Sequence, residues 1–279
     1  MRRISRHSKR GAFSLLEMIG VLAIIAIVAA IISPNLARRI SRINGEKEDE
    51  KLAVIGEALL RSARTYQSIP GTSTWVTNVA TMTGLPINEI RYVNADTNNA
   101  RVYLIHPAFA PTNAAITDPL WTQTSSGAVS VKNARLLIIS SQKANLALPV
   151  SSGRASSAAA FDAIWDWNFD PVTKAPPSGW PASWNGSGEY LHVQRVNFAP
   201  AFYRLTFSNS QFPTAFPIVQ FGSSSSVTLN TTSAIDAYYI QSTYLRLYKD
   251  AVSGGGLDLS YSAETAMNFL YESNRWRIP

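Results

Sequence analysis

The chain lacks cysteine and has few charged residues and few histidines, and these shortages exclude several classes of protein. Without cysteine, its 279 residues hold no disulfide, no thiolate nucleophile and no cysteine-type zinc site. Charged residues are only 15% and apolar residues 46%, which excludes a chain that is disordered throughout. The length suffices for one large domain or two small ones with a packed core.

The formal net charge of +7 belongs to the N-terminus and not to the whole chain. Five cations lie in the first twelve residues, and the remainder has 20 Lys and Arg against 18 Asp and Glu. A basic protein often binds nucleic acid or anionic lipid headgroups. Because the rest of the chain is nearly neutral, we expect no nucleic-acid partner.

One apolar run dominates the N-terminal region. From Phe13 to Ile32, only Ser14, Glu17 and Gly20 are not apolar. Twenty helical residues at about 1.5 Å each span roughly 30 Å, the thickness of the hydrocarbon core of a lipid bilayer. The cations before the run predict a cytoplasmic N-terminus and an extracytoplasmic remainder.

A cleaved secretory signal peptide and a plain signal anchor are the ordinary interpretations of such a run. A signal peptide has a shorter apolar region of roughly 7–15 residues and ends at a small-x-small site, and no Ala-x-Ala site ends this run before Pro34. A signal anchor explains the length and the charge asymmetry but not Glu17. A carboxylate inside a spanning helix costs about 2.5–3.5 kcal/mol on insertion scales, so it usually has a function and a partner.

The sequence GAFSLLEMIGVLAIIAIVAAIISPNL, residues 11–36, resembles the N-terminus of type IV pilins and of the pseudopilins of type II secretion systems. In that family a basic leader ends at a small residue and an aromatic residue begins the mature protein. A glutamate is fifth in the mature protein and a proline is near position twenty-two. Counted from Phe13, Glu17 is fifth and Pro34 is twenty-second.

The resemblance implies a cut between Ala12 and Phe13 by a prepilin peptidase, followed by methylation of the new Phe13 amine. The family usually has glycine before the cut, where this chain has Ala12 with Gly11 one residue earlier, so a cut after Gly11 is the alternative. In a filament, the amine of Phe13 would lie near Glu17 of a neighbouring subunit. Opposite charges attract strongly at low dielectric, so Glu17 would favour subunits that enter in the correct register.

The resemblance also implies partners and a location. The partners would be other pilin or pseudopilin subunits, an inner-membrane assembly platform and the lipid bilayer. The chain would cross the bacterial inner membrane once, with its C-terminal domain in the periplasm, and then enter a periplasmic or extracellular filament. The expected function is that of a pseudopilin or minor pilin, a structural subunit of a type II secretion or type IV pilus filament.

The predicted fold class is α+β, with a long N-terminal helix packed on a mostly antiparallel β domain. Three segments are expected: a basic leader at residues 1–12, a transmembrane and amphipathic spine helix at 13–68, and an extracytoplasmic, mainly β domain at 69–279. Nine stretches rich in β-branched and aromatic residues predict strands. They are residues 101–106, 135–140, 190–198, 202–207, 216–221, 226–230, 238–248, 257–261 and 269–278, the last with a hairpin turn at Ser273-Asn274.

Within the long helix, Pro34 predicts a kink or local melting near residues 30–34, because it cannot donate a main-chain hydrogen bond. The charged residues 46–51 predict a solvent-facing turn or two. Beyond them, one apolar face is expected to pack on the β domain; it consists of Leu52, Ile55, Leu59, Ala63 and Tyr66. A second, short helix is expected from residue 75 to 84.

The segment 151–188 is rich in Ser, Ala, Gly and Pro but holds four of the seven tryptophans. We expect an irregular excursion fixed to the core by aromatic anchors. The alternative is a ligand-facing loop with Trp180 and Trp184 as ligand contacts. The chain would then be an adhesin or carbohydrate-binding module, displayed on a filament or anchored in the membrane.

No constellation of catalytic residues is apparent, so we expect no enzyme. His106 and His192 are the only histidines beyond the leader, and no zinc-protease, nucleophile-elbow, phosphate-loop or dinucleotide-binding pattern occurs. We expect no metal site and no cofactor. The exception considered is a calcium ion near Asp162, Asp166 and Asp170, or near Asp250 and Asp258.

Overall fold

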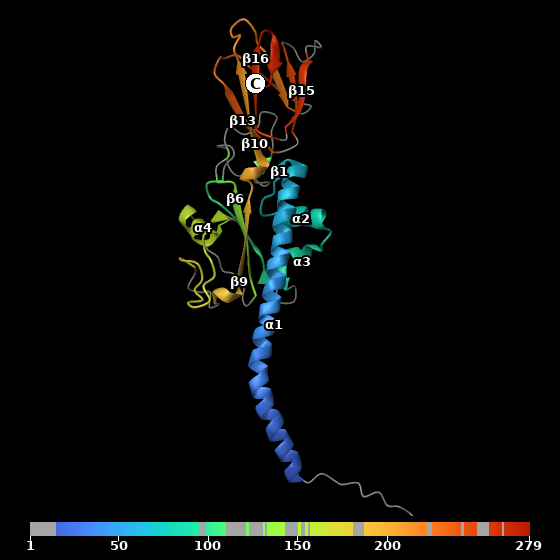
Figure 1. Cartoon of the computed structure of the whole chain (residues 1–279), viewed down its shortest axis with the longest axis vertical. Helices are drawn as coiled ribbons and strands as arrows, with labels where there is room; N and C mark the ends of the chain where they lie inside the picture. Colours follow the sequence, from blue (N-terminus) through green and yellow to red (C-terminus); the bar gives the residue numbers. More distant parts are fainter. Residues whose placement is uncertain are drawn as a thin grey trace, which may run out of the picture. The chain divides into compact units, whose positions relative to one another are not determined.

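A computed structural model describes residues 15–94, 99–109, 121–122, 131, 133–142, 150–151, 154–155, 157–180, 187–221, 225–240, 243–249, 257–263 and 265–279. The fold is α+β, as the sequence predicts: a long helix is followed by a mostly antiparallel β region (Figure 1). The chain divides into two compact units between Lys47 and Glu48.

Helix α1 (Leu15–Tyr66) is the long helix, the blue element of Figure 1. It runs through Pro34 without interruption, so the local melting predicted there is wrong. A proline removes one main-chain hydrogen bond and bends a helix, but it does not end one whose flanking turns remain intact. One residue later, the Asn35 side-chain amide donates a hydrogen bond to the Ile31 carbonyl at 3.4 Å, so this polar side chain is satisfied within the helix.

The second half of α1 buries the apolar face that the spacing predicts. Leu52, Ile55, Leu59 and Ala63 are buried in a core shared with strands of the first sheet and with two short helices. Those helices are α2 (Trp75–Thr83) and α3 (Ile87–Arg91). Tyr66 is 46% exposed, so its assignment to the buried face is wrong. It is the last residue of α1, where the chain leaves the helix through Gln67 at a φ of 49°.

The first sheet has the strand order β7-β8-β4-β6-β9. Its strands are β4 (Val102–Ile105), β6 (Arg135–Ser141), β7 (Val150–Ser151), β8 (Arg154–Ala155) and β9 (Leu191–Asn197). Alternate residues of β6 point to opposite faces of the sheet. Leu136 and Ile138 pack in the core with α1, whereas Leu137 and Ile139 pack in a smaller core with α4 (Ala158–Trp165). This double coverage explains why the β6 sequence reads as a continuous apolar run.

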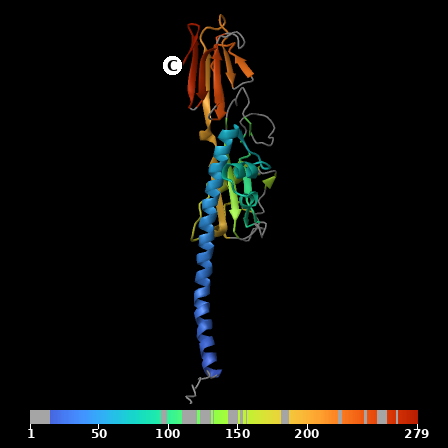
Figure 2. The same ribbon diagram turned by 90° about the vertical axis from the view of Figure 1, so that its right-hand side faces the viewer.

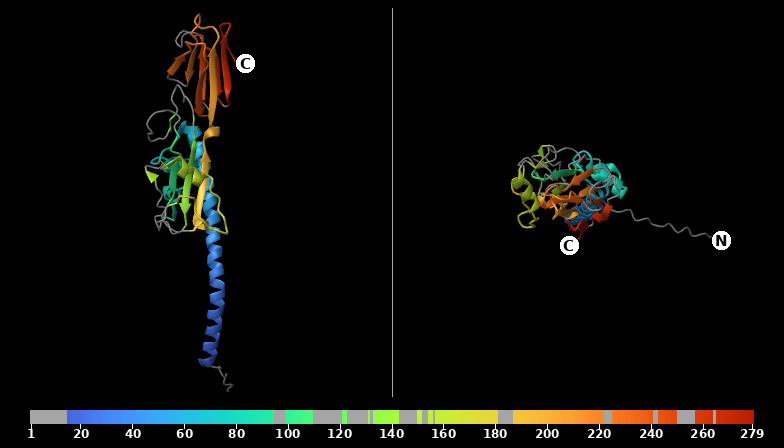
Figure 3. Two further views of the ribbon diagram at one scale, coloured as in Figure 1. Left: turned by 90° about the vertical axis from the view of Figure 1, so that its left-hand side faces the viewer. Right: turned by 90° about the horizontal axis from the view of Figure 1, so that it is seen from above.

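A second β core is formed by two four-stranded sheets, drawn orange to red in Figures 2 and 3. One has the order β13-β10-β16-β17 and the other β12-β11-β14-β15. Phe207 of β10 and Phe269 of β16 stack at 5.3 Å and pack with Leu245 and Leu247 of β14. The strands are β10 (Phe202–Asn209), β11 (Ile218–Phe221), β12 (Ser225–Thr228), β13 (Ile235–Ile240), β14 (Thr243–Tyr248), β15 (Leu257–Ala263), β16 (Met267–Glu272) and β17 (Arg275–Arg277).

Most predicted strands are confirmed, and three features differ. The stretch 238–248, predicted as one strand, contributes to β13 and β14 in different sheets. Helix α4 forms inside the segment expected to be irregular, with the Ser157 hydroxyl accepting from the Ala160 amide as its N-cap. β10 pairs in parallel with β16 in an otherwise mostly antiparallel region.

The hairpin turn at Ser273-Asn274 is confirmed, with φ of 49° and 61° at the two positions. The remaining short elements are β1 (Ser68–Ile69), β2 (Tyr92–Asn94), β3 (Asn99–Ala100), β5 (Trp121–Thr122), η2 (Gly188–Tyr190) and η3 (Ala199–Ala201).

Candidate functional site

The first candidate site is the N-terminal part of α1. The predicted cut at Ala12 and Phe13 lies outside the described residues. Glu17 lies in the first turn of α1 and is exposed, and Pro34 is a helical residue of the same element. The helix therefore presents the Glu17 carboxylate at the start of its apolar part.

This part of α1 is apolar on all sides. Between Leu15 and Ile32, its described large apolar side chains are exposed in the isolated chain, from 47% for Val28 to 79% for Leu15. Within the described residues, α1 is the one helix long and apolar enough to cross a membrane, and none of its most apolar stretch is buried. The core helix of a soluble domain would be mostly buried, so this surface needs lipid or other protein to cover it.

A second feature is a buried ion pair that joins α1 to Arg101, the residue just before β4 of the first sheet. Arg101 Nε lies 2.7 Å from Glu48 Oε1, and Arg101 Nη2 lies 2.7 Å from Glu48 Oε2. The side chains are 0% and 6% exposed. Arg101 Nη1 also donates to the main-chain carbonyls of Glu89, Ile90 and Tyr92 at 2.6, 2.9 and 2.8 Å. The prediction that the charged residues 46–51 face solvent is therefore wrong for Glu48, whose side chain points into the protein.

The next residue of α1 contacts β9, an edge strand of the same sheet. Asp49 Oδ1 lies 2.7 Å from His192 Nδ1, and the His192 side chain is 9% exposed. His192 stands opposite Ser140 in the β6–β9 pairing. Within the described part of the chain, His192 Nε2 and Ser140 Oγ are buried without a hydrogen-bond partner.

The tryptophan-rich segment packs on the core beside α4. Trp165, Trp167 and Trp180 are half-buried against it, as the anchor interpretation expects. Arg195 of β9 donates to the carbonyls of Trp165 and Trp167. Trp184 lies outside the described residues, so its role as a ligand contact stays a prediction.

The carboxylates considered for calcium mostly have protein partners. Asp162 pairs with Arg135 at 2.8 Å, and Asp258 accepts from the Trp276 amide at 2.5 Å. The Val172 amide and the Thr173 hydroxyl donate to Asp170 and hold the pKa of its carboxyl below the usual range. Asp250 lies outside the described residues, and in the described ranges no three His, Asp or Glu side chains cluster as a metal site would require.

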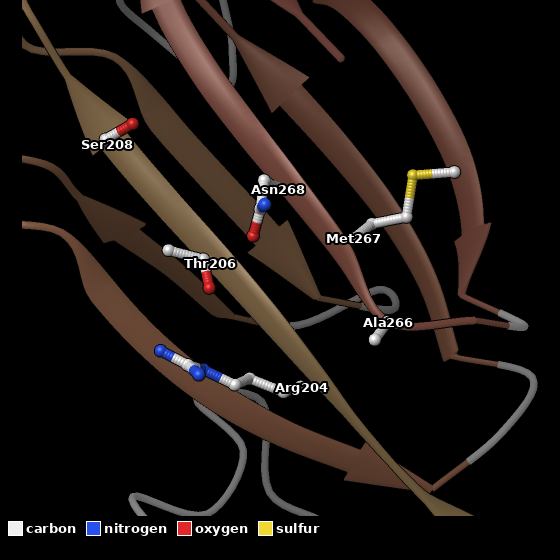
Figure 4. Close-up of a pocket in the computed structure, with 6 residues that line it drawn as sticks. All are labelled: Arg204, Thr206, Ser208, Ala266, Met267 and Asn268. Atoms are coloured by element: carbon white, nitrogen blue, oxygen red, sulfur yellow. The ribbon is translucent and has the colours of Figure 1, made fainter. Parts of the chain in front are cut away.

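A hollow of about 550 Å³ lies on the outward face of the sheet β13-β10-β16-β17 (Figure 4). Its lining residues are Arg204, Thr206 and Ser208 of β10, and Ala266, Met267 and Asn268 at the start of β16. No sequence pattern predicts that these residues lie together, because β10 and β16 are far apart along the chain and become neighbours only by pairing.

Comparison with known proteins gives one match. Residues 7–33 match the family model described as the prokaryotic N-terminal methylation motif. Neither the curated proteins nor the solved structures give a match to the chain.

Proposed function

Because residues 7–33 carry the cleavage signal of type IV pilin and pseudopilin precursors, we propose that the mature chain is a structural subunit of a type IV pilus or type II secretion filament. The chain is a type IV pilin-like precursor of a kind that a prepilin peptidase processes. The methylation motif carries this proposal, and the wholly exposed apolar part of α1 supports it, because both a membrane and a filament core would cover that surface.

In this proposal the chain first waits in the inner membrane and is then drawn into a filament by an assembly platform. Head-to-tail contacts that do not close on themselves generate open helical assemblies. Glu17 of one subunit would meet the methylated amine of Phe13 of the next, which removes the cost of an isolated charge in an apolar environment. This pairing would set the axial register between subunits.

Within the family, we propose a pseudopilin or minor pilin. The chain carries a second β core, of two sheets, beyond the sheet that packs on α1. Such additional bulk on each subunit suits a component present in few copies better than one that must pack repeatedly along a filament. The role is structural and not enzymatic in this proposal: His106 is buried edge-on against Phe161, and His192 is bonded to Asp49.

The decisive test is the intact mass of the chain expressed with and without a prepilin peptidase. We expect the peptidase to remove residues 1–12 and the product to gain one methyl group. Sequencing the new N-terminus decides between a cut after Ala12 and a cut after Gly11. A chain that stays unprocessed beside a processed control pilin overturns the proposal.

The assembly role of Glu17 is tested separately. Glu17→Ala should be inserted and processed normally but should fail to enter filaments, because the amine then has no acidic partner. Glu50→Ala, which removes an exposed carboxylate from the same helix, is the matched control and should assemble. Normal assembly of Glu17→Ala would contradict the charge-pairing role.

A further inference from the structure

The hollow on the outward face of β10 and β16 has the side chains of a binding site. Leu205 and Phe207 of β10 point into the second β core, so Arg204, Thr206 and Ser208 between them point outward. Asn268 lies across from Thr206 in the parallel β10–β16 pairing. Figure 4 shows Asn268 beside the row of β10 side chains, with the small Ala266 at the end of the hollow. A volume of about 550 Å³ is within the range typical of small-ligand sites.

The polar groups in the hollow are held in place before any ligand binds. Asp236 of β13 accepts from Arg204 Nη2 at 2.8 Å and from the Thr206 hydroxyl at 2.7 Å. This contact occupies one nitrogen of the guanidinium, and in the described part of the chain no hydrogen bond occupies Arg204 Nε or Nη1, or the Asn268 side-chain amide. Asp236, which is next to the hollow, therefore holds the Arg204 and Thr206 side chains in place, and the hollow also offers the hydroxyl of Ser208 and the side-chain amide of Asn268.

The charge balance indicates what kind of ligand fits. Arg204 and Asp236 neutralise each other, so neither an anion nor a cation finds an uncompensated partner. A neutral ligand rich in groups that both donate and accept hydrogen bonds suits the mixture. Hydroxyl groups do this, and neighbouring hydroxyls match the planar, two-pronged geometry of guanidinium and amide groups.

We propose that this hollow binds a neutral saccharide. Peptides bind sheets mainly through main-chain hydrogen bonds at an edge strand, whereas β10 is paired on both sides, with β13 and β16, and offers only side chains. The inference goes beyond the filament role and does not depend on it. It also places saccharide binding on the outward face of the sheet β13-β10-β16-β17 and not in the tryptophan-rich segment. Among the described residues that line the hollow there is no aromatic ring, so a dissociation constant on the order of 1 mM is expected for a single site.

The test uses the full chain in detergent, on an array of immobilised neutral polysaccharides: glucan, mannan, galactan and polymeric N-acetylglucosamine. We expect at least one to be bound, and Asn268→Ala to weaken that binding about tenfold through the lost amide hydrogen bonds. Asn88→Ala is the matched control, because Asn88 is also an exposed asparagine but lies on α3. It should bind as the wild type does.

A second variant tests the charge balance. Asp236→Asn leaves the Arg204 charge uncompensated, so it should weaken binding of the neutral polysaccharide and increase binding to heparin, an anionic probe, relative to the wild type. The proposal is overturned if no neutral polysaccharide is retained, if Asn268→Ala binds as the wild type does, or if Trp180→Ala alone abolishes binding. Failure here leaves processing and filament entry intact, so it is distinguishable from failure of the proposed function.

Discussion

Replacing Glu48 by glutamine should strongly destabilise the compact unit Glu48–Pro279, although the side chain keeps its shape. The substitution removes the negative charge from a pair whose side chains are 6% and 0% exposed and puts an amide N–H against a guanidinium N–H. Removing one partner of a buried ion pair costs about 3–5 kcal/mol, because the remaining charge is buried without compensation. That is a large share of the roughly 5–15 kcal/mol by which folded domains are stable.

Equilibrium urea unfolding of the full chain in detergent, followed by tryptophan fluorescence, measures this loss. Trp75 is a suitable reporter, because it stacks on Tyr103 at 5.3 Å in the core beneath α1. Arg101→Met should lose more than Glu48→Gln, since it also leaves three main-chain carbonyls without their donor.

The matched control is Glu272→Gln. Glu272 pairs with Arg277 at 3.1 Å, but the side chains are 38% and 56% exposed. An exposed pair contributes at most about 1 kcal/mol, so this variant should unfold almost as the wild type does. A Glu48→Gln loss as small as the control's would refute the reasoning, because burial would then not decide the cost.

Three further variants test the core, a close contact and a titration. Leu59→Ala should lower the free energy of unfolding by about 2–5 kcal/mol in the same assay, because Leu59 is fully buried; a loss below about 1 kcal/mol would mean that the core refills the space. Gly188→Ala should make the chain near Ala175 more sensitive to limited proteolysis, because the new Cβ would lie 2.8 Å from the Ala175 carbonyl oxygen; unchanged cleavage contradicts this. Hydrogen bonds from Arg204 and Thr206 lower the pKa of Asp236 in the folded state. The Asp236 carboxylate therefore stabilises the fold above its unfolded pKa, and this stabilisation is lost as the pH falls through the folded pKa. The melting temperatures of the wild type and Asp236→Asn should therefore converge below about pH 4, and a constant gap down to pH 2 would argue against the pairing.

The N-terminal features could be read from the sequence because they depend on local properties. An apolar run of membrane-spanning length, the basic residues before it and a carboxylate near its start, Glu17, need no knowledge of the fold. The helical spacing of Leu52 and Leu59 likewise predicts the face that α1 buries. Several strands follow from short apolar runs, such as residues 135–140, which form most of β6.

Other features depend on distant residues. The run 46–51 has the composition of a solvated stretch. Nothing near it indicates that Glu48 would pair in the protein interior with Arg101, 53 positions later. The separation of residues 238–248 into β13 and β14 follows from the partners that each half finds in different sheets.

The sequence by itself determined that this protein has a prepilin-type N-terminus and a long helix, because cleavage signals and membrane spans are encoded in consecutive residues. Only the tertiary structure decided where α1 is fastened and where a ligand could bind. The Glu48–Arg101 pair and the hollow between β10 and β16 each join residues that are remote in the chain, and strand pairing and packing alone bring them within hydrogen-bonding distance.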